Sequence, residues 1–75
     1  MLKELENIIN EILLNKNKKK LEKLLPTMSL RNEIGLDSLD LAELTVKIES
    51  IYDIDIFEDG IVENIQEILD KLDND

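Results

Sequence analysis

Ser38 is the residue best placed for chemistry, because it lies between two carboxylates, Asp37 and Asp40, where a helix is expected to begin. The first N–H groups of a helix are unpaired and the positive end of its dipole lies there, so a phosphate meets donors that already point at it. An exposed hydroxyl at that point is also accessible to a modifying enzyme. We therefore expect Ser38 to accept a phosphate-linked group or, as the alternative, Ser38 or Asp37 to be only an N-cap.

Catalysis by these residues is not expected. A serine nucleophile needs a base beside it, and no His or Lys is near Ser38 in the sequence. Asp37 and Asp40 are an acid pair in principle, but their negative charge opposes removal of a proton from the hydroxyl. The sequence offers no nucleophile–base pair and no metal-ligand set, so we expect a protein that is not an enzyme.

The composition narrows the class of protein further. The 75 residues include no Cys and no His, so any thiol chemistry must use a borrowed group. The acids at 53, 55 and 59 do not form a calcium loop, because Glu58 stands where that loop needs glycine. No apolar run approaches the roughly 20 residues of a membrane span, and the N-terminus has no apolar signal core. We expect one domain, residues 1–75, in a soluble, cytoplasmic and monomeric protein.

Charge is distributed unevenly along the chain, whose net charge is −9. Residues 1–36 contain seven basic and five acidic residues, whereas residues 37–75 contain two basic and thirteen acidic ones. An acidic half argues against nucleic acid and favours basic protein partners. The basic run at 15–20 is interpreted as a solvated surface loop in preference to a binding patch.

Apolar periodicity predicts three main helices, at about 2–15, 38–52 and 63–72. The loop at 27–36 carries four apolar side chains that should anchor it to the core, and Pro26 breaks the chain before it. Residues 53–57 are expected to be extended, and 58–62 to form one short helical turn. The prediction is an all-α fold, a small up-and-down four-helix bundle with a short third helix.

The helix at 38–52 has two apolar stripes on nearly opposite sides. One is expected to face the core, and the other to be exposed beside acidic residues as a docking face or as ordinary surface scatter. The expected core stripe is Leu41, Leu44, Ile48, Ile51 and Tyr52. The expected outer stripe is Leu39, Ala42 and Val46, beside Asp40, Glu43 and Glu49.

These features together resemble the acyl carrier protein family. The residues that carry the resemblance are Gly35 to Asp40, Glu43-Leu44, Ile48-Glu49 and the downstream segment from Ile54 to Val62, so that nearly the whole chain is covered. The resemblance implies that Ser38 carries 4′-phosphopantetheine, transferred from coenzyme A by a Mg²⁺-dependent phosphopantetheinyl transferase. The thiol of that group would hold an acyl or aminoacyl cargo as a thioester, which matches a chain that has no thiol of its own.

The resemblance also implies partners and site residues. Asp37 flanks the attachment site, and the partner-facing residues are Leu39, Asp40, Ala42, Glu43, Val46 and Glu49. The partners are the transferase, a loading ligase for the cargo, and a downstream acyltransferase or synthase. The alternative is a helical interaction module that docks a basic partner through the same helix without carrying cargo.

Three departures from the fatty-acid-synthesis pattern make the chain more similar to specialised carriers of polyketide, nonribosomal peptide, D-alanyl or polysaccharide pathways. Lys47 is a base within the central helix, Ser50 and Ile51 follow Glu49 where acids are usual, and residues 56–65 are about two residues shorter. The end of the chain at Asn74 and Asp75, soon after the last helix, is expected of a freestanding carrier.

Overall fold

The computed structural model describes residues 1–73 as four helices joined by loops. The helices are α1 (Leu2–Asn15), the short η1 (Leu30–Ile34), which is a π-helix, α2 (Ser38–Tyr52) and α3 (Ile65–Asp73). The described residues contain no strand, only an isolated antiparallel bridge between Ser29 and Asn64. The small helical bundle is therefore confirmed. Asn74 and Asp75, on which the freestanding expectation drew, lie outside the described residues.

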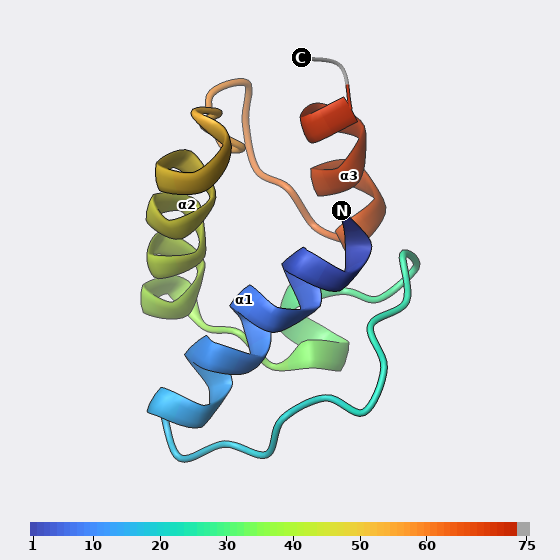
Figure 1. The fold of residues 1–75 in the computed structure, drawn as a ribbon, viewed down its shortest axis with the longest axis vertical. Coiled ribbons are helices and arrows are strands. Elements are labelled where there is room, and N and C mark those ends of the chain that lie inside the picture. Colours follow the sequence, from blue (N-terminus) through green and yellow to red (C-terminus); the bar gives the residue numbers. More distant parts are fainter. Residues whose placement is uncertain (74–75) are drawn as a thin grey trace.

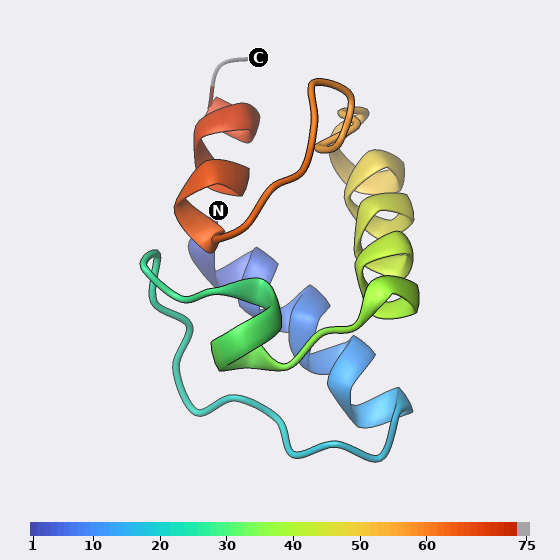
Figure 2. The ribbon, with the colours of Figure 1, turned by 180° about the vertical axis from the view of Figure 1, so that it is seen from behind.

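In Figure 1, α1 runs diagonally from the lower end of α3 to a position below α2. Seen from behind, α2 and α3 stand on opposite sides of the molecule, and η1 lies below α3 and in front of α1 (Figure 2). The core draws aliphatic side chains from all four helices, and ten of these are Leu5, Ile9, Ile12, Leu13, Leu30, Ile34, Leu44, Ile48, Ile65 and Ile68. Burial of these side chains provides the main driving force for folding, since each is worth about 1.5–3 kcal/mol when removed from water.

The short helix lies at a different place from the one expected. Residues 58–62 were expected to form a helical turn, but residues 56–60 form turns, with Glu58 N–H donating to Asp55 O and Gly60 N–H to Phe57 O. The fourth helix is η1, inside the segment predicted to be a loop. Buried Leu30, Ile34 and Leu36 do anchor that segment to the core, as predicted.

Backbone hydrogen bonds connect the approach to η1 with the start of α3. Leu30 N–H donates to Glu63 O at 2.9 Å, and Ile65 N–H donates to Met28 O at 3.1 Å. Gln66 N–H donates to Pro26 O at 2.8 Å. These bonds join segments about 35 residues apart in the chain and fix η1, the helix that leads into the Ser38 region.

The core stripe of α2 is confirmed except at one residue. Leu41, Leu44 and Ile48 are buried and Tyr52 is half-buried, but Ile51 is 60% exposed. Tyr52, one residue further along, packs against the core, so the end of α2 is covered on one side. Ile51 lies about 100° around the helix from Tyr52, at the edge of the stripe, and the sequence pattern does not specify how wide the covered side is.

Candidate functional site

Ser38 is the first residue of α2, and its side chain is exposed. The N-cap is Asp37, whose Oδ1 accepts a hydrogen bond from Asp40 N–H at 2.9 Å. Asp40 in turn accepts from Asp37 N–H through Oδ2 at 3.1 Å, which completes a capping box. Because the two aspartates cap the helix between them, the Ser38 hydroxyl is left free for another role.

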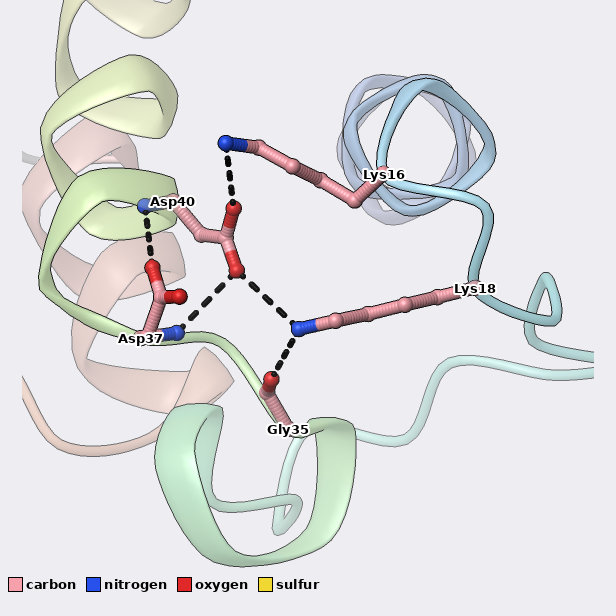
Figure 3. Close-up of polar contacts among 5 residues, drawn as sticks. All are labelled: Lys16, Lys18, Gly35, Asp37 and Asp40. Atoms are coloured by element: carbon pink, nitrogen blue, oxygen red, sulfur yellow. Dashed lines mark hydrogen bonds and ion pairs between the residues drawn. The ribbon is translucent and has the colours of Figure 1, made fainter.

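Asp40 is fully buried, which differs from the exposed position expected for it. Two lysines from the chain after α1 extend toward its carboxylate, with Lys16 Nζ 3.6 Å from Oδ1 and Lys18 Nζ 3.3 Å from Oδ2 (Figure 3). Lys18 Nζ also donates to Gly35 O at 3.0 Å. This lysine clasp, made of Lys16, Lys18 and Asp40, joins the end of α1 to the start of α2.

The clasp keeps Asp40 ionised although its side chain is out of water. Burial is the largest single influence on the pKa of Asp40, and it raises that pKa. The bonds from Asp37 N–H and Lys18, with the charges of Lys18 and Lys16, together outweigh burial, so the pKa lies below its ordinary value. Among the described residues Oδ1 accepts no hydrogen bond, so the Lys16 ammonium is its nearest compensation.

The turn from η1 into α2 sets the position of Ser38. Ser29 caps η1 by accepting from Asn32 N–H through Oγ at 3.1 Å, and Glu33 Oε1 accepts from Ser29 N–H at 2.9 Å. The helix ends at Gly35, whose φ of 90° suits a residue without a Cβ. The chain then passes through buried Leu36 into the capping box of α2.

A guanidinium lies beside the Ser38 hydroxyl. Arg31, on η1, donates from Nη2 to Ser38 Oγ at 3.3 Å. Next to this pair is a shallow groove of about 270 Å³ between α2 and the loop at 57–61. Besides Arg31 and Ser38, its lining residues are Leu41, Ala42, Phe57 and Ile61. The Ser38 hydroxyl therefore lies beside a cation and borders a largely apolar groove that the same arginine lines.

The outward side of α2 is exposed and mixed in character. Leu39 is 72% and Val46 is 67% exposed, which confirms that the second apolar stripe is on the surface. We call the set Leu39, Ala42, Glu43, Val46 and Glu49 the outer face of α2. Ala42 and Glu49 are exposed and Glu43 is half-buried. The prediction that Asp40 belongs to this face is wrong, because its side chain is turned inward to the lysine clasp.

Comparison with known proteins identifies the family. The family model described as "Phosphopantetheine attachment site" matches residues 4–72. The chain belongs to this family. The chain is also 36% identical over 70 residues to a protein named acyl carrier protein from Syntrophus aciditrophicus (strain SB), an alignment that covers 91% of this chain and 88% of the relative. No solved structure matches the carrier. Its function is therefore that of an acyl carrier, and its prosthetic group is phosphopantetheine.

Sequence reasoning missed two features of the carrier's site. The basic run was interpreted as solvated, yet Lys16 and Lys18 pair with Asp40. Arg31 was not singled out, although it is the only arginine in the chain, which is the one signal that could have drawn attention to it.

Two further observations concern residues 1–73 alone. This part of the carrier contains no group of three or more acidic, His or Cys side chains that could hold a metal. No helix within it is long and apolar enough to cross a membrane.

Proposed function

We propose that Ser38 Oγ is the atom to which phosphopantetheine is attached. The observation that carries the proposal is that Ser38 is exposed at the first position of α2 while Asp37, and not Ser38, caps the helix. The residues around it suit a phosphodiester that bears a long arm, because Arg31 donates to Oγ and an apolar groove begins at the same residue. When bound, the group supplies a thiol that holds an acyl or aminoacyl cargo as a thioester.

The chain itself supplies position and not catalysis. The only side-chain hydrogen bond to Ser38 among the described residues comes from Arg31, which is a donor and cannot remove a proton. Asp37 uses Oδ1 to accept from Asp40 N–H. Deprotonation of the hydroxyl therefore falls to the phosphopantetheinyl transferase, as Oγ displaces the nucleotide portion of coenzyme A. This supports the proposal that the chain is a carrier and not an enzyme.

The test of the attachment site is intact mass after incubation with coenzyme A, Mg²⁺ and a phosphopantetheinyl transferase. Wild type should gain one phosphopantetheine and Ser38→Ala should gain none. Ser50→Ala is the matched control, because Ser50 is an exposed serine on the same helix and should leave loading unchanged. A loaded Ser38→Ala protein would refute the assignment, and an unloaded wild type would favour the interaction module.

The outer face of α2 is proposed as the surface that partner enzymes contact. Two exposed aliphatic side chains, Leu39 and Val46, lie beside Glu43 and Glu49, a combination that suits a partner with an apolar patch and basic side chains. The partners are the transferase, a cargo-loading ligase, and an acyltransferase or synthase. Ser38 is at the beginning of the same helix, so a partner bound there would lie next to the attachment point.

We also propose that the chain acts as one domain, as a freestanding monomer and in the cytoplasm. The family match from residue 4 to residue 72 supports one domain. The relative's alignment over 88% of its own length supports a carrier of about this size that works as a separate chain.

A further inference from the structure

Arg31 is chemically unlike every other base in the chain. It is the single arginine, and the eight remaining bases are lysines. A guanidinium is planar, weakly hydrated and able to bind two phosphate oxygens at once, whereas an ammonium acts as a point charge. The one guanidinium in the molecule is also the one whose donor lies at 3.3 Å from Ser38 Oγ.

The neighbouring lysines are engaged elsewhere. Lys16 and Lys18 pair with the carboxylate of Asp40, and Lys18 also donates to Gly35 O. Within residues 1–73, Arg31 has no carboxylate oxygen within 4.0 Å, and its side-chain hydrogen bond goes to Ser38 alone. Glu63 borders a hollow that Arg31 also lines, without forming an ion pair with it. The guanidinium is therefore available to an anion.

We propose that Arg31 binds the phosphodiester of the group carried on Ser38 and thereby sets the direction in which the arm leaves the helix. This inference rests on the proposed attachment at Ser38. When phosphorus replaces the hydroxyl hydrogen, Oγ becomes an ester oxygen of the phosphodiester, and the charged phosphate oxygens are two bonds away from the atom that Arg31 Nη2 already contacts. The added negative charge would otherwise stand beside Asp37 in the acidic half of the chain, where it is repelled.

The backbone of Arg31 is well fixed for this role. It lies on η1, next to Leu30, which is 1% exposed, and Ile34 of the same short helix is 7% exposed. Leu30 N–H is bonded to Glu63 O, so η1 is attached to the segment before α3 as well as to the core. The side chain of Arg31 is exposed, but the point from which it extends does not shift relative to Ser38 without disturbing buried leucine and isoleucine.

Arg31 borders two hollows, and the proposed phosphate position directs the arm into one of them. Arg31 and Ile61 line both, but Ser38 lines only the groove with Leu41, Ala42 and Phe57. The other hollow, of about 330 Å³, is bordered by the polar side chains of Ser29, Asn32 and Glu63. A phosphate held between Ser38 and Arg31 lies at the mouth of the apolar groove, so the arm is directed along α2 and not toward Glu63.

The test uses two variants, Arg31→Gln and Lys19→Gln. Each variant, like wild type, is prepared in an unloaded and a phosphopantetheine-loaded form. Lys19 is an exposed base with no ion pair among the described residues, so its variant controls for the loss of one positive charge. For each protein the melting temperature of the loaded form minus that of the unloaded form is measured at low ionic strength. Arg31→Gln should lower this difference by about 1–8 °C, the range for an exposed ion pair in a domain of this size. Lys19→Gln should leave this melting-temperature difference at the wild-type value. The difference for Arg31→Lys should lie between those of Arg31→Gln and Lys19→Gln.

A second readout follows the guanidinium directly. Because the chain has one arginine, a ¹⁵N-labelled sample gives one side-chain Nε–H signal that needs no assignment. Loading of wild type should shift this signal, and about 1 M salt, where the Debye length is about 3 Å, should reduce the shift. An unmoved signal with equal melting differences in Arg31→Gln and Lys19→Gln would overturn the inference and leave attachment at Ser38 standing. Failure of wild type to load, or loading at another residue, would overturn both.

Discussion

At the scale of single residues, Asp40 is the point where three parts of the chain meet. Its carboxylate pairs with Lys16 and Lys18 from beyond α1 and caps α2 through Asp37 N–H. Removing a buried charge that is paired lowers the stability of the fold, because its partners then have no opposite charge or hydrogen-bond acceptor. Asp40 therefore supports the geometry around Ser38 without being accessible to a partner enzyme.

We expect Asp40→Asn to lower the free energy of unfolding by about 1–3 kcal/mol, measured by urea denaturation at neutral pH. The folded pKa of Asp40 lies below its ordinary value of about 3.9, so this stabilisation is complete above that value. It is lost as the pH falls through the lower folded pKa, and the difference between wild type and variant should shrink there. Asp37→Asn is the control, since asparagine caps a helix as well as aspartate does. Equal stability of Asp40→Asn and wild type at neutral pH would contradict the clasp.

The residues at the site were only partly predictable. Ser38 could be singled out because its neighbours in the sequence define the helix start. The inward orientation of Asp40 could not be assigned with the same ease, because the lysines that turn it inward are more than twenty residues away in the chain. Its angle around the helix, about 40° from buried Leu44 and about 100° from exposed Leu39, was the available signal. Arg31 lies seven residues before Ser38, and only the turn through η1 and Gly35 brings the two side chains together.

At the scale of elements, α2 has one side in the core and one side open. The bounds of α1 and α2 agree with those expected from apolar periodicity, since both helices are long enough for an apolar repeat to be detected. The predicted location of the short helix was wrong, because five residues contain too few turns for a period to be detected. The hydrogen bonds that join residues 26–30, at and before the π-helix, to residues 63–66 connect segments far apart in the chain and leave no local pattern in the sequence.

The outer face of α2 leads to a prediction about transfer rates. Val46→Asp should lower kcat/KM for phosphopantetheine transfer by about tenfold or more, as expected when a well-packed apolar contact worth about 1.4 kcal/mol is lost. Ile51→Asp is the matched control, because Ile51 is also an exposed aliphatic residue on α2 but lies about 140° around the helix from Val46. Equal rates for the two variants would show that the transferase does not contact this face.

At the scale of the whole molecule, charge opposes the fold. Residues 37–75 contain thirteen acids and two bases, and much of this charge is at the surface. Repulsion among exposed charges is screened by salt, whereas the pairing of Asp40 with Lys16 and Lys18 is partly buried and is screened less. Added salt should therefore weaken the repulsion among exposed acids more than it weakens the attraction within the lysine clasp, and so stabilise the fold.

We expect the melting temperature to rise as sodium chloride is added from low ionic strength to about 0.15 M, where the Debye length is about 8 Å. Glu58→Lys, which replaces an exposed acid in the acidic half, should reduce this rise. Lys19→Glu, which removes an exposed base, should increase it. Coincident melting curves at the two salt concentrations would mean that self-repulsion has no measurable part in the stability.

The central claim is that Ser38 carries the prosthetic group, and peptide mapping of the loaded wild type tests it most directly. Cleavage after Arg31 and Lys47 releases residues 32–47, in which Ser38 and Thr45 are the only hydroxyl side chains. Fragmentation of this peptide should place one phosphopantetheine on Ser38, with Thr45 and every other peptide unmodified. A phosphopantetheine on any other residue, or none on residues 32–47 of a protein that has gained its mass, would contradict the account.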